Sequence, residues 1–273
     1  MNSRKLLKAV KISKSAFYSY DEHTQEFDYQ DFKIIDKYFQ KSKQKHGIRQ
    51  LRMAIERSEG LVFNEKKIAR IKRKYGLETQ IRKKSKIRFF AKNKLEHETF
   101  PNILERDFSQ SKPDRVYSTD ITQINYGNKK AYVAAVKDLC TKEIVGKSVS
   151  NRIDLNLTTT AINRALRRLT SEEKKKLMIH SDQGFHFTHV SYRTKLEENG
   201  ITQSMSRKGN CLDNAPIESF FGHLKDLLEL DSCKDISEVR KEVTKKINYY
   251  NHYRPQVGLK KMPPSEFRRH INF

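Results

Sequence analysis

The chain has 273 residues, with 56 lysines and arginines against 33 aspartates and glutamates, which gives a net charge of +23. This length allows one sizeable core and a smaller second domain. So large a positive charge favours a nucleic acid partner over a merely well-solvated surface. Three widely spaced cysteines without a CxxC pair argue against a disulfide scaffold or a zinc ribbon. With no long apolar run and no secretory h-region, the composition predicts a cytoplasmic protein.

Residues 1–79 are predicted to form a helical, DNA-binding region, which is the most basic part of the chain. Its first segment reads as a short helix followed by a turn. In the segment 31–44, Phe32, Ile35 and Phe39 recur at spacings of three and four residues. This period is typical of an amphipathic helix.

Two further short helices are predicted to form a helix-turn-helix at about 46–77. Gly60 is a plausible end for the first helix, and Asn64 is a plausible N-cap for the second. Thirteen lysines or arginines and one acid, Glu78, occur within 66–94. A plain helical hairpin with solvated lysines is the alternative, but the crowding of basic residues favours contact with DNA.

Residues 80–113 are charged and lack apolar periodicity, so we predict a basic linker. The pattern then changes to period two, and the run VYSTDITQINY predicts a strand. Gly127 and Asn128 suit a tight hairpin turn, and the runs AYVAAVKDL and IVGKSVS predict two more strands. A helix is predicted over 154–170.

The rest of the domain predicted over 114–235 alternates strands and helices. LMIH is a short buried strand, HVSYRTKLEENG a helix and ITQSM a last short strand. After a polar loop, a long amphipathic helix begins near Asn214, with Pro216 in its first turn, where proline is tolerated. This order predicts a mixed sheet flanked by helices, an α/β fold. Residues 236–273 are predicted to be a helix to about Tyr250 and then a basic tail.

Three acids stand at notable places in this domain. Asp120 lies in mid-strand, where an unpaired carboxylate is costly inside an apolar core. Asp182 directly follows an apolar strand, a common position for ligand-binding acids in α/β folds. Glu218 lies within a helix. Each alone has an ordinary interpretation as a surface or loop acid, but three carboxylates held together repel one another and require a cation.

Hard oxygen ligands of this kind suit Mg²⁺ or Mn²⁺. Two such ions, roughly 3.5–4 Å apart, can stabilise the attacking and leaving oxygens of a phosphoryl transfer. The nucleophile is then water, which gives hydrolysis, or a DNA 3′-hydroxyl, which gives strand joining. The acids and the positive charge together predict a metal-dependent enzyme that cuts and joins DNA.

Basic residues near the acids are candidates for contact with phosphates. Lys225 lies two helical turns after Glu218 on nearly the same face, although an ordinary surface lysine would look the same. Arg207 and Lys208 lie in the polar loop, where they could meet the DNA backbone.

A zinc site is the rival interpretation of this region. His180, His186 and His189 lie close together in the sequence, and Cys211 follows. Their spacing matches no established zinc pattern. His180 is better interpreted as a structural neighbour of Asp182.

Two stretches are the most specific motifs of the chain: HSDQGFHFT around Asp182 and SMSRKGNCLDNAPIESFFGHLK around Glu218. They resemble a known family, the OrfB proteins of the IS-three family of bacterial insertion-sequence transposases. STDIT around Asp120 is similar to the first-acid motif of the family, YNHYRPQVGLKKMPPSEF to its C-terminal signature, and HGIRQL to the start of its helix-turn-helix. Tyr117 stands where relatives often have tryptophan, so an aromatic residue is retained there.

The resemblance implies an RNase H-like, retroviral-integrase-like core of the DDE superfamily, with Asp120, Asp182 and Glu218 as the catalytic, metal-binding triad. It raises Lys225 to an expected DNA contact. Asn214, within the tripeptide Asp213-Asn214-Ala215, is expected to bind DNA and to position the catalytic loop.

The resemblance also implies partners. The DNA partners are the terminal repeats of the element and the target DNA, and a homo-oligomer would bring two DNA ends together. An upstream OrfA protein is expected as a partner or as part of a fusion, and the expected location is the bacterial cytoplasm at the nucleoid. The implied route is copy-out, paste-in. Two alternatives remain open: a nuclease of the same fold that hydrolyses without joining, and a non-catalytic DNA-binding regulator.

Overall fold

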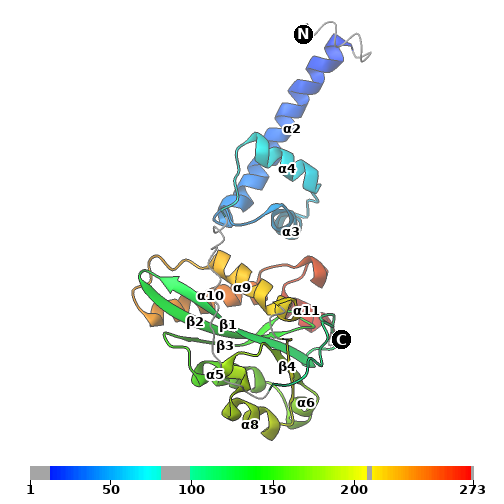
Figure 1. Cartoon of the computed structure of the whole chain (residues 1–273). Helices are drawn as coiled ribbons and strands as arrows, with labels where there is room; N and C mark the ends of the chain where they lie inside the picture. The colour runs from blue at the N-terminus through cyan, green and yellow to red at the C-terminus, as the bar shows by residue number, and fades with distance from the viewer. Residues whose placement is uncertain (1–12, 81–98, 208–210, 272–273) are drawn as a thin grey trace. The chain divides into compact units, whose positions relative to one another are not determined.

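The computed structural model, drawn in Figure 1, describes residues 13–80, 99–207 and 211–271. The chain divides into two compact units, Met1–Lys83 and Lys84–Phe273. Each unit has a hydrophobic core of its own. Within the described ranges, no helix is both long and apolar enough to cross a membrane.

The first unit is helical. Its helices are α2 (Lys14–Lys41), α3 (Ile48–Glu59) and α4 (Glu65–Lys74). Ile35 and Phe39 of α2 are buried against apolar residues of α3 and α4, as their spacing predicts. The short helix and turn were predicted for residues 3–20, and only the part from residue 13 on is described; there α2 is one continuous helix from Lys14. Residues 1–12 lie outside the described part of the chain.

The ends of α3 and α4 follow from local chemistry. Gly60 ends α3 in the left-handed conformation, with φ of 69°, which glycine adopts without steric cost. Asn64 caps α4, because its side chain accepts the backbone N–H of Lys66 at 2.8 Å. The helix-turn-helix pair predicted from the sequence is therefore confirmed.

The second unit is built on one five-stranded sheet. Its strands are β1 (Val116–Tyr126), β2 (Lys129–Asp138), β3 (Ile144–Ser150), β4 (Met178–Ser181) and β5 (Thr202–Met205). They lie in the order β3-β2-β1-β4-β5. The first three pair antiparallel, whereas β4 is parallel to both β1 and β5. The predicted mixed sheet is confirmed.

Helices cover both faces of this sheet (Figure 1). They are α5 (Leu155–Leu166), α6 (Ser171–Lys175), α7 (Phe185–Thr188), α8 (Val190–Glu198), α9 (Ala215–Leu227), α10 (Ile236–His252) and α11 (Pro264–Ile271), with short 3₁₀ turns at Cys211–Asn214 and Val257–Leu259. Strand β2 shows the two layers directly, because successive side chains point to opposite faces. Ala134 and Val136 enter the core with α5 and α8, whereas Val133 and Ala135 enter the core with α9 and α10.

Two segments outside the sheet differ from their sequence interpretation. Leu104, within the predicted linker 80–113, is 4% exposed and packs with Val116 and Leu139 of the second unit. The predicted basic tail contains α11, whose Arg268 is buried. Residues 81–98, most of the predicted linker, lie outside the described part.

Candidate active site

Asp120 stands in the middle of β1, opposite Ala135 of β2. It is half-buried, and its Oδ1 accepts the backbone N–H of Ile121 at 2.7 Å. Burial raises its pKa well above the ordinary range, the charges of Asp182 and Glu218 raise it further, and the charge of Lys225 opposes them. The carboxylate therefore lies in a region where negative charge is disfavoured unless a cation is present.

Asp182 directly follows β4, the parallel neighbour of β1. The register pairs Ser118 with His180, so Asp120 and Asp182 both stand two residues beyond one paired position. Asp182 Oδ1 accepts the backbone N–H of Gly184 at 3.0 Å, and burial raises its pKa. A β-carbon at position 184 would lie 2.9 Å from this oxygen, so a glycine there leaves room for the carboxylate.

Glu218 comes from α9, which packs on β1 through Ile217 and Phe220. The residue is exposed overall. Partial desolvation of its carboxylate by the surrounding protein, and then the charge of Asp182, raise its pKa. The three carboxylates thus come from β1, the end of β4 and α9, and their charges influence one another. We call Asp120, Asp182 and Glu218 the acid group.

These carboxylates affect one another's pKa, but they are not arranged as a complete set of metal ligands. Among the described residues, no three His, Cys, Asp or Glu side chains are gathered closely enough to hold a metal ion. Their donor chemistry nevertheless fits a hard divalent cation, because all three are carboxylates. Burial raises the pKa of each, and a bound cation would offset that penalty.

Lys225 lies on α9 two turns after Glu218. It is half-buried, and its charge is felt at Asp120. The structure therefore places this lysine within the field of the acid group, as its helical spacing from Glu218 suggests.

Asn214 and Asp213 brace the start of α9 from inside the protein. Ser118 Oγ donates to Asn214 Oδ1 at 2.8 Å, and Asn214 is 3% exposed. Because Ser118 stands two residues before Asp120, this bond ties the start of α9 to β1. The buried position supports the predicted positioning role of Asn214 and does not support a direct contact with DNA.

Asp213 receives charged partners from two segments. Arg106 Nε donates to it at 2.6 Å, and Arg207 donates from both Nε and Nη2 at 3.0 Å. The hydrogen bond from Arg207 is the main reason why the pKa of Asp213 lies far below its ordinary value. Sequence reasoning missed this role, and the only signal was the position of Asp213 directly before Asn214.

Arg207 and Lys208 of the polar loop were predicted to contact DNA. Arg207 is already bound to Asp213, although its side chain is 61% exposed. A contact between Arg207 and DNA stays a prediction. Lys208 lies outside the described residues.

His180 is buried with both ring nitrogens in hydrogen bonds. Its Nε2 lies 3.0 Å from the carbonyl oxygen of Asp213, and its Nδ1 lies 2.9 Å from Ser204 Oγ. Because a carbonyl only accepts, Nε2 carries the proton. The ring therefore joins β4 to the start of α9, a role that matches a structural neighbour of Asp182 and leaves no nitrogen for zinc.

In the first unit, several cations of the basic helix α4 are used inside the protein. Arg70 forms a two-pronged ion pair with Asp28, and Lys74 joins the same carboxylate at 3.0 Å. Lys67 pairs with Asp31, and Lys72 lies 3.8 Å from the ring centre of Phe39. The basic crowding seen in the sequence is therefore partly structural.

Comparisons with known proteins agree with this architecture. A family model described as an integrase core domain matches residues 110–211, and a second with the same description matches 199–264. A model of an HTH-like domain matches 26–85. The chain is 35% identical over 266 residues to the putative transposase InsK for insertion sequence element IS150 of Escherichia coli strain K12, covering 96% of this chain and 92% of that protein.

The chain belongs to the IS-three family of insertion-sequence transposases. It is also 30% identical over 227 residues to the transposase InsF for insertion sequence IS3A of Escherichia coli strain K12, covering 81% of this chain and 77% of the relative. An uncharacterized transposase-like protein of Haemophilus influenzae is 36% identical, covering 79% of this chain and 98% of that protein. The transposase family expected from the sequence motifs is thus confirmed.

Solved structures give weaker likenesses to this transposase. A chain of the simian T-cell lymphotropic virus intasome in complex with a PP2A regulatory subunit matches at 16% identity with a TM-score of 0.49, covering 65% of this chain and 61% of that chain. The HTLV-2 integrase catalytic core domain in complex with magnesium matches at 16% identity with a TM-score of 0.46, covering 57% of this chain and 97% of that domain. The family assignment does not depend on them.

Proposed function

We propose that this transposase cuts and joins DNA at the ends of an insertion sequence by metal-dependent phosphoryl transfer, with Asp120, Asp182 and Glu218 as its acidic site. One observation carries the proposal. Three carboxylates from β1, the end of β4 and α9 share one electrostatic group, and within the described ranges none of them forms an ion pair with a protein cation. Carboxylates left in this state suit an incoming metal ion and phosphate.

The three acids would hold one or two Mg²⁺ or Mn²⁺ ions. When bound, such ions stabilise the charge that develops on the attacking and leaving oxygens of a phosphodiester. Lys225, whose charge reaches Asp120, would hold a phosphate oxygen of the DNA beside the acids. The buried brace of Asn214, Asp213 and His180 would keep Glu218 aligned with the two aspartates.

The proposed reaction has two steps, strand cleavage and strand joining. Water attacks a phosphodiester at the element's end, the bond from phosphorus to the 3′-oxygen breaks, and a free 3′-hydroxyl remains. That hydroxyl then attacks a second phosphodiester, so a new phosphodiester forms as another breaks. No serine, cysteine or tyrosine nucleophile is required, because the carboxylates serve only to hold and orient the reacting groups.

DNA is the partner that this reaction requires. Joining two ends requires both to be held together, so we expect the chain to act as an oligomer on DNA, and an OrfA partner or fusion would add further DNA binding.

The test compares the wild-type chain with Glu218→Gln in a strand-transfer assay with Mg²⁺ or Mn²⁺ and DNA that carries the element's ends. We expect metal-dependent joined products from the wild type and a loss of more than about a hundredfold in the variant, since losing a metal ligand exceeds the effect of losing its outer support. DNA binding should be retained. Glu198→Gln, the same change at an exposed position on α8, is the matched control.

Each outcome discriminates. Joining by Glu218→Gln at the wild-type rate would remove Glu218 from the site. Nicking without joining by the wild type would favour a nuclease over a transposase. DNA binding without any metal-dependent chemistry would favour the non-catalytic regulator.

A further inference from the structure

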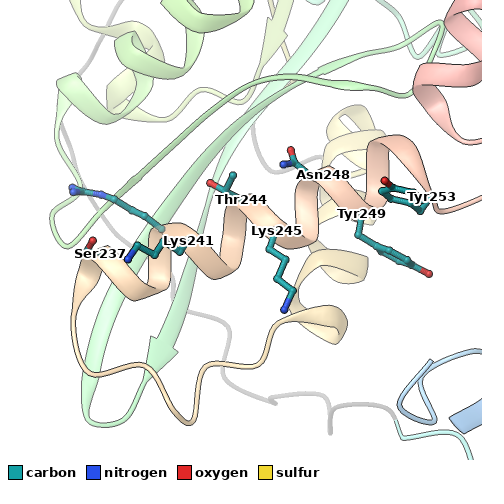
Figure 2. Close-up of a pocket in the computed structure, with 8 residues that line it drawn as sticks. Ser237, Lys241, Thr244, Lys245, Asn248, Tyr249 and Tyr253 are labelled. Carbon is teal, nitrogen blue, oxygen red and sulfur yellow. The ribbon is translucent and has the colours of Figure 1, made fainter. Parts of the chain in front are cut away.

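A basic surface of the second unit lies along the exposed face of α10. Figure 2 shows its side chains in succession along the helix. The groove has a volume of about 680 Å³ and is lined by Ser237, Arg240, Lys241, Thr244, Lys245, Asn248, Tyr249 and Tyr253. Positions 237, 241, 245 and 249 are four residues apart, so they form one ridge on the helix. Tyr253 directly follows the end of α10. The opposite face of α10, with Val239, Val243 and Ile247, packs into the core.

This groove continues onto the edge strand β3. A second hollow of about 370 Å³ lies between β3, the start of α5 and α10, and it shares Arg240 and Thr244 with the first. Its other charged residues are Lys147, Arg164 and Asp154. The two hollows therefore form one continuous surface, here named the α10–β3 groove.

Two arginines of the groove are anchored on the free edge of the sheet. Arg164 of α5 donates from Nη1 to the carbonyl of Lys147 at 2.7 Å, and Arg240 of α10 donates from Nε to the carbonyl of Val149 at 2.9 Å. They reach β3 from helices that pack on opposite faces of the sheet. A guanidinium has five N–H donors, so each is oriented by one bond and has further donors to offer a ligand.

The charge of the groove is unbalanced. Five cations line it against a single carboxylate, Asp154. Asp154 is occupied as the N-cap of α5, where it accepts the N–H of Leu157 at 2.9 Å. Within the described part of the chain, no ion pair is formed by any of the five cations, which are Lys147, Arg164, Arg240, Lys241 and Lys245.

Lys147 of β3 lies within this basic groove beside Arg164. Burial and then the charge of Arg164 lower its pKa to about 8. A positive charge that is destabilised by its surroundings is stabilised when an anion binds. The groove thus favours a ligand that carries several negative charges along its length.

Aromatic rings stand at one end of the same ridge. Tyr249 and Tyr253 stack with their ring centres 6.5 Å apart, and Tyr253 is 71% exposed. Cations that follow a groove beside an exposed aromatic ring are typical of surfaces that bind nucleic acid strands. A purely acidic protein segment would make less use of the rings.

We propose that the α10–β3 groove binds the phosphate backbone of a DNA segment outside the acidic site. None of the residues lining the groove belongs to the acid group or to its brace. A second copy of this chain docked on the same surface would bring like charges together, so DNA suits the groove better. The inference rests on the proposed function only in that the protein acts on DNA.

The test measures the binding of fluorescent DNA to the full chain by anisotropy at several salt concentrations. We expect Lys241→Ala/Lys245→Ala to weaken binding about tenfold and to reduce the slope of log affinity against log salt by about 2, since each lost phosphate contact removes about 0.9. Adding Arg240→Ala should enlarge both effects. The double variant retains the bond from Arg240 to β3, so its fold is preserved.

The matched control is Lys174→Ala/Lys176→Ala, which removes the same charge at the end of α6, outside the groove. If the groove variant and the control had the same affinity and salt slope, the proposal would be overturned. A changed oligomeric state with unchanged DNA affinity would also overturn it, in favour of a second copy. Glu218→Gln separates the two proposals, because it should retain binding and its salt slope even where joining is lost.

Discussion

The second unit has two groups of three carboxylates, and they differ in whether a protein cation neutralises their negative charge. Asp114, Asp138 and Glu143 converge on Arg268 of α11, whose three guanidinium nitrogens each lie 2.6 Å from one of them. Asp120, Asp182 and Glu218 also share one region, but no described arginine or lysine forms an ion pair with them. The first group is a closed structural cluster, whereas the second is left open.

The pKa of one member from each group shows the difference. Burial alone would raise the pKa of Asp114, but hydrogen bonds from Arg268 and Tyr117 outweigh it, so the pKa is lowered. Burial raises the pKa of Asp120 as well, and its acidic neighbours add to the rise. Arg268 therefore outweighs burial at Asp114, although burial still raises the pKa of Asp138. At Asp120 burial and the neighbouring acids act in the same direction, and a bound cation would offset them.

The largest effect on stability is expected at Arg268. Arg268→Met would leave Asp114 and Asp138 without their ion-pair partner, whereas Glu143 would keep Arg168 at 3.3 Å. Breaking such a buried pair costs about 3–5 kcal/mol. The free energy of unfolding, measured with denaturant, should fall by that amount. Arg269→Met, an exposed neighbour on the same helix, should change it by less than about 0.5 kcal/mol. Equal effects of the two variants would mean that the Arg268 cluster does not stabilise the fold.

Asp213→Asn is expected to have a smaller effect. It weakens the charged hydrogen bonds from Arg106 and Arg207, and the loss should be about 2–3 kcal/mol. Since the pKa of Asp213 is lowered in the folded protein, its contribution is present above its unfolded pKa of about 3.9 and is lost as the pH falls further.

The variant should therefore lose part of the wild type's sensitivity to acid. Unfolding curves of both proteins at pH 7 and pH 3 measure this. A stability difference that stayed constant between the two pH values would contradict the ion-pair interpretation.

The smallest effect has the opposite sign. Asp120→Asn removes a charge from the open group, so the metal-free protein should gain about 1 kcal/mol, as is common where an active site trades stability for function. Adding Mg²⁺ should raise the melting temperature of the wild type, because a ligand of the folded state stabilises it. The variant should respond less. A variant that is destabilised without metal and stabilised normally by Mg²⁺ would show that Asp120 is an ordinary structural acid.

Much of the second unit could be predicted from local patterns. The run around Asp120 forms β1 with the predicted bounds, Gly127 stands in the predicted hairpin turn, and Pro216 lies in the first turn of α9. These features depend on alternation, capping and steric limits within a few residues, which a sequence displays directly. The family motifs then marked Asp120, Asp182 and Glu218 as one set before their positions were known.

Only the tertiary structure showed which side chains are buried or paired with residues far away in the sequence. The segment with Arg268 was predicted to be a basic tail, and it contains a helix whose Arg268 pairs with acids 125 to 154 residues earlier. Leu104 was predicted to lie in a linker, but in the structure it is buried against Val116 and Leu139. The ion pair between Arg207 and Asp213 could not be read from the sequence, whereas the contact of Arg207 with DNA stays a prediction. Local sequence determines backbone preference, whereas the balance of buried charge is determined only when the chain brings remote residues together.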